Sequence, residues 1–173
     1  MSIHIIVDGY NLIRQSDNLI HLDDQDIQLG REALLDRLAA YRRIRHHRIT
    51  VVFDGANAPL FSQHKSQIKG IHVKFSRSGE SADAVIKRMA DHEREKALVV
   101  SSDLDVVNFA ASKGAATISS PKFEEKMELA AYITAKGIES EEINGWAPTT
   151  KKKGPRKRLS KQKRRDRIKI RKL

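Results

Sequence analysis

Residues 3–11 read IHIIVDGYN, an apolar run that ends at an acidic residue and a glycine. The pattern recurs at residues 51–55, which read VVFDG, and at residues 97–103, which read ALVVSSD. Short runs rich in Val and Ile that stop at turn residues are typical of buried β-strands. In open parallel sheets, ligand sites form at the carboxyl ends of such strands. The three stretches therefore predict a parallel sheet with an acidic site at one edge.

The rest of the chain indicates the order of strands and helices. Strands are expected at residues 3–7, 49–53, 71–75, 97–101 and 115–118. Apolar residues at helical spacing predict helices over 30–46, 81–95, 104–113 and 123–136. Residues 57–70 show no clean period and are expected to form a loop or a short helix. Because strands alternate with helices, we expect an α/β fold with a mainly parallel five-stranded sheet and right-handed crossovers.

Four aspartates are expected to meet at one edge of this sheet. Asp8, Asp54 and Asp103 each follow a strand, and Asp83 lies in the first turn of helix 81–95, which begins at the same edge. Ligand sets made only of oxygen suit a hard cation such as Mg²⁺ or Mn²⁺. Such a metal would activate water and stabilise the charge that develops during phosphodiester cleavage. Asn11 would orient a water or a phosphate by hydrogen bonding.

Each acid also has a purely structural explanation. Asp103 precedes a helix and would cap it, Asp54 would form a turn with the next glycine, and Asp83 is an acid in a first helical turn. Asp105 favours the dipole of the helix that follows Asp103, so a supporting role suits it better than a ligand role. Asp8 is the hardest to explain in this way, because an acid that ends a buried central strand must be paired or functional.

Other kinds of site lack their signatures. The chain has no cysteine, its seven histidines show no zinc-binding pattern, and no phosphate-cradling G-x-x-x-x-G-K-[ST] motif is present. No segment approaches the roughly 18 apolar residues of a membrane helix. The residues before Asp8 are too few for a signal peptide. We therefore expect a cytoplasmic protein that does not associate with a membrane.

The positive charge is concentrated at one end of the chain. Of 33 Lys/Arg and 22 Asp/Glu residues, 14 basic residues and one acid lie within residues 151–173, so the rest of the chain is slightly acidic. We expect a globular part over 1–137, a linker over 138–150 and a Lys/Arg-rich tail over 151–173 that binds a polyanion. The alternative is a solubilising tail without a specific partner. With few apolar residues, the tail should be disordered or loosely helical when free.

The ordered motifs at residues 5–13, 51–55, 75–86 and 99–105 resemble those of the NYN domain, a branch of the PIN-like nuclease superfamily, and most closely its YacP-type bacterial ribonucleases. The resemblance covers about residues 1–136. It implies a three-layer α/β/α, PIN-like fold, divalent-metal-dependent ribonuclease chemistry and an RNA substrate. Carried over by position, Asp8, Asp83 and Asp103 would bind the metal, Asn11 would accompany them, and Asp54 and Asp105 would be further candidate ligands.

Two functions from different classes are consistent with these features. The first is an endoribonuclease that uses Mg²⁺ or Mn²⁺ to cleave messenger, ribosomal or transfer RNA. In one form of this hypothesis the enzyme acts on the ribosome. The second is a non-catalytic RNA- or ribosome-binding protein whose acidic pocket holds a structural cation. Aromatic residues make up only 5% of the chain, which argues against a base-stacking platform. The expected RNA-binding residues are Lys151, Lys152, Lys153, Arg156, Lys157, Arg158, Lys161, Lys163, Arg164 and Arg165.

Overall fold

A computed structural model of the chain describes residues 3–57, 65–136 and 160–173. Its elements are, in order, β1 (His4–Asp8), α1 (Gly9–Arg14), α2 (Asp17–Gln25), α3 (Ile27–Arg45), β2 (Arg48–Phe53), η1 (Gly55–Asn57), β3 (Lys65–Ile68), β4 (Ile71–Phe75), α4 (Ala82–Glu93), η2 (Arg94–Lys96), β5 (Ala97–Val100), α5 (Leu104–Ser112), β6 (Ala116–Ile118), α6 (Ser120–Lys136) and α7 (Lys161–Arg171). No helix in the described ranges is long and apolar enough to cross a membrane.

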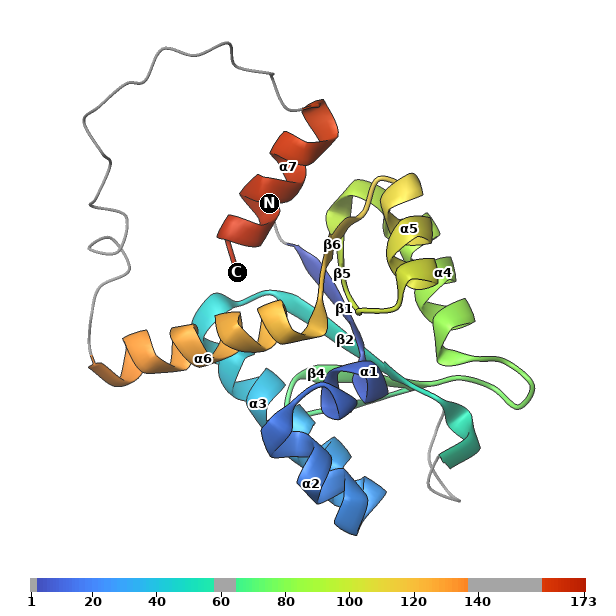
Figure 1. Ribbon diagram of the computed structural model, residues 1–173, viewed down its shortest axis with the longest axis vertical. Helices are drawn as coiled ribbons and strands as arrows, with labels where there is room; N and C mark the ends of the chain where they lie inside the picture. Colours follow the sequence, from blue (N-terminus) through green and yellow to red (C-terminus); the bar gives the residue numbers. More distant parts are fainter. Residues whose placement is uncertain (1–2, 58–64, 137–159) are drawn as a thin grey trace.

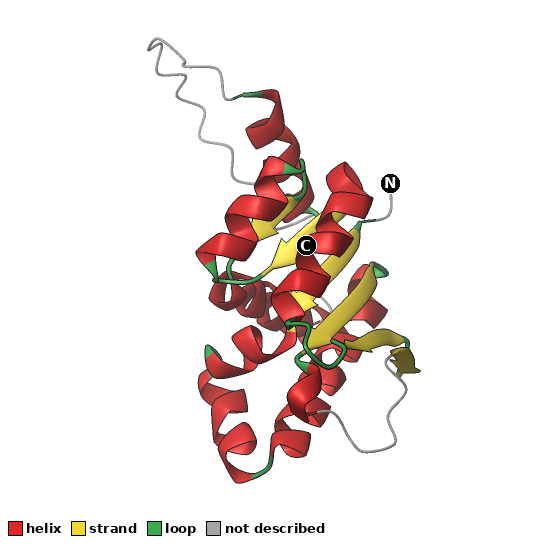
Figure 2. Cartoon of the chain, turned by 90° about the vertical axis from the view of Figure 1, so that its right-hand side faces the viewer, coloured by secondary structure: helices red, strands yellow, loops and turns green. Residues whose placement is uncertain are grey.

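The expected α/β class and three-layer arrangement are confirmed. The strands form one sheet in the order β3-β4-β2-β1-β5-β6, in which only β3 runs antiparallel to its neighbour. Figure 2 shows the strands lying between helices, and Figure 1 shows α3 and α6 on one side of the sheet and α4 and α5 on the other. The helices therefore cover both faces of the sheet, as parallel strands require.

The alternation of side chains along the strands divides the core in two. Ile5 and Val7 of β1 point to the side of α3 and α6, whereas Ile6, between them, packs with Val85 and Ile86 of α4. Successive side chains of a strand face opposite sides of a sheet, so a strand buried on both faces reads as a continuous apolar run. This is why the runs stand out in the sequence.

The prediction of five strands was wrong by one. The stretch expected to be a loop or short helix contains β3, which pairs with β4 through the two-residue turn of Lys69 and Gly70. Both turn residues have positive φ, 52° and 83°, as a tight hairpin turn requires. The strand is short, lies at the sheet edge and reads Lys-Ser-Gln-Ile, so it lacks the apolar alternation that marks a strand in sequence.

The described part of the tail forms a helix that packs onto the body, which differs from the expectation of a disordered or loosely helical segment. Helix α7 lies beside β6 (Figure 1). Leu173, directly after it, is 1% exposed in the core that contains Tyr41, and the Tyr41 hydroxyl donates a hydrogen bond to the Leu173 carbonyl oxygen. Arg165 of α7 forms an ion pair with Glu95. The buried leucine and these polar contacts fix a helix that composition alone does not predict.

Candidate functional site

The order of the strands reverses around β1. From β1 the chain adds β2 and then β4 on one side, and α4 carries it back to β5 on the other side. Strand β1 is therefore paired in parallel with both β2 and β5. At such a point the loops that leave two adjacent strands diverge and open a crevice at the carboxyl edge.

A pocket of about 570 Å³ occupies this crevice. Five residues of the predicted site line this pocket: Asp8, Asn11, Asp54, Asp83 and Asp103. Asn11 lies in α1. Asp8 ends β1, Asp54 follows β2, Asp103 caps α5 after β5, and Asp83 is in the first turn of α4. Residues that are up to 95 positions apart in sequence thus share one concave surface.

Asp8 is the most enclosed of the four carboxylates, with 7% of its surface exposed. Its Oδ1 accepts a hydrogen bond from the backbone N–H of Asn11 at 3.3 Å, and its Oδ2 accepts one from the Ser101 hydroxyl at 3.0 Å. The pKa of Asp8 is raised to about 6, mainly by burial. The neighbouring Asp83 and Asp103 contribute to this rise, and the two hydrogen bonds act in the opposite direction. The cost of charging Asp8 is consistent with a site that gains from a nearby cation.

Two other carboxylates use one oxygen for local structure and leave the second one available. Asp103 Oδ1 accepts from the N–H groups of Asp105 and Val106 and so caps α5, and Asp54 Oδ1 accepts from Ala56 N. Within the described residues, Oδ2 of Asp54 and of Asp103 accepts no hydrogen bond. A capping role and a ligand role are therefore compatible in the same side chain.

Asp83 has no capping role in the described structure, and its carboxylate accepts no hydrogen bond there. Partial burial raises its pKa, the neighbouring Asp103 raises it further, and Lys87 lowers it. Proximity of like charges in a crevice raises the free energy of the ionised pair unless a cation or a proton relieves it.

Asn11 is held in one orientation. Its Oδ1 accepts from the backbone N–H of Ser102 at 2.9 Å and from the Ser120 hydroxyl at 2.7 Å. Because a backbone N–H can only donate, the accepting atom must be the oxygen, which leaves the Asn11 NH₂ group as a donor in a residue that lines the pocket. This donor suits a phosphate oxygen or a water molecule.

The two glycines that follow Asp8 and Asp54 allow the chain to pack closely behind the pocket. A Cβ atom on Gly9 would lie 2.3 Å from the Phe53 ring, and one on Gly55 would lie 2.0 Å from the backbone oxygen of Ser76. No side chain fits at such distances. The repeated Asp-Gly pair thus combines a carboxylate with the close approach that positions it.

The structure does not bring every predicted site residue into the pocket. Asp105 points elsewhere, is largely exposed and forms an ion pair with Lys87. Of the predicted RNA-binding residues, Lys161, Lys163 and Arg164 are exposed on α7, and Arg165 there pairs with Glu95. The remaining ones lie outside the described residues: Lys151, Lys152, Lys153, Arg156, Lys157 and Arg158.

The site also includes residues that the sequence analysis did not assign to it. Tyr10, Arg14 and Gln15 line the pocket, and Ser101 donates to Asp8. Arg14 is exposed and lies one helical turn after Asn11. This spacing places both side chains on the same side of a helix, and it could have indicated that Arg14 belongs to the site. Ser101 comes directly after β5, at the same edge as the acids.

The oxygens of the pocket fit a hard divalent cation in their chemistry. No three His, Asp or Glu side chains in the described ranges converge closely enough to hold an ion between them. Mg²⁺, however, keeps several waters and contacts only one or two carboxylates directly in many sites. The available oxygens of Asp54, Asp83 and Asp103 around one hollow meet that lesser requirement.

Comparison with known proteins agrees with this architecture. The family model of the YacP-like NYN domain matches residues 5–172. The YacP protein of Bacillus subtilis (strain 168) is 30% identical over 86 residues, a match that spans half of this chain and half of that relative. A crystal structure of Rae1 (YacP) from Bacillus subtilis has a TM-score of 0.65 and 26% identity, covering 84% of this chain and 86% of that one. A point mutant of the same protein gives a TM-score of 0.66 at 24% identity, covering 84% and 85%.

Proposed function

This chain belongs to the YacP-like NYN family, a group of PIN-like nuclease-type domains, and from that premise we propose that it is a divalent-metal-dependent endoribonuclease. The observation that carries the proposal is the pocket itself. Four aspartates and an oriented amide donor line one hollow at the point where the strand order reverses. A protein that only bound RNA would gain nothing from a cluster of negative charge where phosphates must approach.

We propose that Mg²⁺ or Mn²⁺ binds among Asp8, Asp83, Asp103 and Asp54, with one or two of these carboxylates in direct contact and the others acting through water. A cation bound there would supply a water of lowered pKa and would stabilise negative charge on the phosphodiester. Side chains of the protein would perform the remaining roles. Asn11 donates to a phosphate oxygen or to the attacking water, and Ser101 and Asn11 N hold the Asp8 carboxylate in place. Because Asn11 is fixed by two hydrogen bonds, its donor needs little reorganisation during the reaction.

We propose RNA as the substrate class. Cleavage assays with messenger, ribosomal and transfer RNA would identify the type of RNA. The basic residues of the tail would supply sequence-independent affinity for the phosphate backbone of RNA, including the RNA of a ribosome. Lys161, Lys163 and Arg164 are exposed on α7 and are available for such contacts.

The test is cleavage of end-labelled single-stranded RNA by the full chain with Mg²⁺, with Mn²⁺ and with chelator. We expect cleavage only with metal, and a loss of about 100-fold or more in Asp83→Asn, the size typical of losing one electrostatic group at a reaction centre. Asp83 is chosen because Asn there breaks no hydrogen bond of the described structure. The control is Asp24→Asn, an exposed aspartate of α2 outside the pocket. RNA binding without cleavage under every metal condition would favour the non-catalytic RNA-binding alternative, and cleavage that persists in chelator would contradict the metal site.

A further inference from the structure

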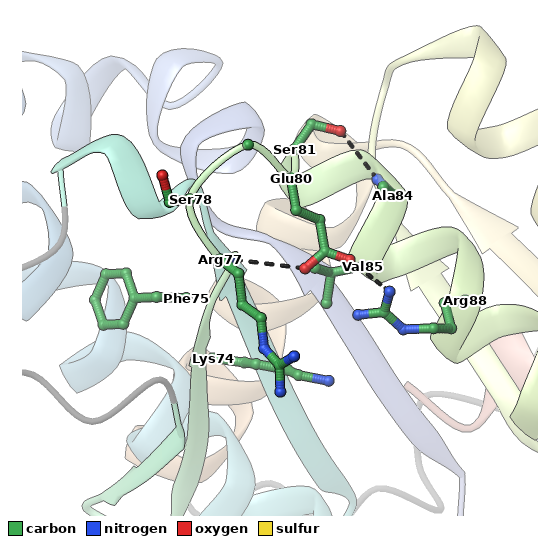
Figure 3. Close-up of a pocket in the computed structure, with 10 residues that line it drawn as sticks. Lys74, Phe75, Arg77, Ser78, Glu80, Ser81, Ala84, Val85 and Arg88 are labelled. Carbon is green, nitrogen blue, oxygen red and sulfur yellow. Dashed lines mark hydrogen bonds and ion pairs between the residues drawn. The ribbon is translucent and has the colours of Figure 1, made fainter.

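A second hollow, of about 840 Å³, adjoins the acidic pocket and has the opposite charge. It is formed by the end of β4, the loop after it and the first turns of α4. Lys74, Arg77 and Arg88 contribute cationic side chains to it, and Glu80 is its acid. Figure 3 shows the Glu80 carboxylate between Arg77 and Arg88. We name it the basic hollow.

The first turn of α4 forms the boundary between the two hollows and contributes residues to both. Ser81, which caps α4 by accepting from Ala84 N, lines both of them. Asp83 then lines the acidic pocket, whereas Ala84 and Arg88, four residues apart, line the basic hollow. Residues four apart share one side of a helix, so α4 presents an acid to one hollow and a cation to the other. A chain that passes over Ser81 can reach both.

We propose that the basic hollow holds backbone phosphates of the RNA strand next to the phosphodiester in the acidic pocket. The inference rests on the proposed function, which places a phosphodiester beside the aspartates. The aspartates repel a polyanion, and cations at the adjoining surface offset that repulsion and fix the path of the strand. Contacts to phosphate set position and register without reading sequence.

The ion pairing within the hollow indicates which cations a phosphate meets. Arg88 forms an ion pair with Glu80 and lowers the pKa of that carboxyl group, so Glu80 remains ionised. Glu80 also accepts from the backbone N–H of Arg77. Within the described residues, the Arg77 guanidinium donates no hydrogen bond. An entering phosphate therefore binds Arg77 directly and replaces Glu80 as the partner of Arg88.

This arrangement predicts effects of opposite sign from neighbouring substitutions. Arg77→Gln and Arg88→Gln each remove one phosphate contact. They should weaken binding and reduce the dependence of log K on log salt by about 0.7 each, the value for one phosphate of a single strand. Glu80→Gln releases Arg88 and removes a repelling charge, so it should strengthen binding. The opposite sign separates a charge effect from damage to the fold, because damage would weaken binding in all three variants.

The experiment measures fluorescence anisotropy of a labelled single-stranded RNA with the full chain, in chelator so that no cleavage occurs, across a range of salt. The matched control is Arg43→Gln, an exposed arginine of α3 on the other side of the sheet, for which we expect a slope and affinity equal to those of the wild type. The inference is overturned if the Arg77→Gln, Arg88→Gln double variant retains the wild-type slope and affinity.

Two further arms identify the source of the phosphate and separate the two proposals. If adenosine monophosphate displaces RNA from the wild type but not from the double variant, the hollow takes a terminal phosphate and the backbone assignment is wrong. Cleavage by the wild type in Mn²⁺ is measured in parallel. If the wild type cleaves RNA and the double variant binds RNA normally, only the proposal for the basic hollow is overturned. If the wild type never cleaves RNA and the double variant shows a smaller salt dependence of binding, only the proposed nuclease activity is overturned.

Discussion

Replacing Asp8 by Asn should stabilise the metal-free protein at neutral pH while it abolishes metal-dependent RNA cleavage. Asp8 is buried at the end of β1, and burial raises its pKa from 3.8 to about 6. The ionised carboxylate is therefore less stable in the folded protein than in the unfolded chain. Asn removes this charge, retains an oxygen that can cap α1, and supplies no negative charge to a bound cation.

The size of the gain follows from the shift. A shift of one pKa unit corresponds to 1.36 kcal/mol, so a rise of two units costs about 3 kcal/mol when Asp8 is ionised in both states. Loss of the Ser101 hydrogen bond offsets about 1 kcal/mol of the gain. A net gain of about 2 kcal/mol raises the Tm of a chain of this size by about 4–8 °C.

The sign of the pH dependence provides a second check. Because the folded pKa lies above the unfolded one, the penalty is absent below about pH 4, grows as pH rises and is complete above about pH 6. The advantage of Asp8→Asn should therefore disappear near pH 4. Buried His4 has a lowered pKa and destabilises the fold in the opposite sense, as pH falls. His4 is present in both proteins, so comparing variant with wild type at each pH cancels its effect.

Thermal unfolding in chelator at neutral pH and near pH 4 is the assay, with Asp24→Asn as the control. We expect the exposed control to change stability by no more than about 0.5 kcal/mol at either pH. An Asp8→Asn protein that melts below the wild type at neutral pH would refute the reasoning, and so would a gain that is equal at both pH values. Normal metal-dependent cleavage by the variant would refute the proposed role of Asp8.

Three other predictions test separate parts of the structure. Asp103→Asn should weaken Mn²⁺ binding more than Asp105→Asn in calorimetric titration, since only Asp103 lines the pocket, and equal affinities would reduce Asp103 to a helix cap. Leu173→Ala should lower the free energy of unfolding in denaturant by about 2–5 kcal/mol because the side chain is fully buried, and a negligible change would show that α7 does not pack on the body. Lys163→Gln on exposed α7 should reduce the salt slope of RNA binding by about 0.7 at unchanged Tm, and an unchanged slope would contradict its role in binding.

The sheet could be predicted because its strands are buried on both faces. Each of the five predicted strands is present in the structure, with bounds that differ by no more than one residue. The same signal is absent where burial is partial. Strand β3 lies at an edge. It is fixed by the turn of Lys69 and Gly70 and by pairing with β4, and an apolar pattern within the strand itself reveals neither. Helices α1 and α2, over residues 9–25, were likewise not predicted.

The candidate site could be predicted in outline because topology alone brings strand ends together. That argument needs only the chain position of Asp8, Asp54 and Asp103 and the rule that parallel strands end at one edge. It fails for Asp105, which lies two positions after Asp103 in α5 and pairs with Lys87 instead of lining the pocket. It also cannot identify Ser101, whose role depends on a hydrogen bond across adjacent strands.

The basic tail shows why composition is a poor guide to anchoring. Residues 151–173 are rich in charge, and their mean properties predict no packing, yet one terminal leucine enters a core that already exists. Full burial of a leucine contributes about 1.5–3 kcal/mol, which is independent of the charges beside it. Ile170 packs against the same core, and Arg165 finds Glu95 on the body. The exposed cations of α7 are thereby carried on a fixed helix, so a polyanion that binds them incurs a smaller ordering cost than it would with a flexible arm.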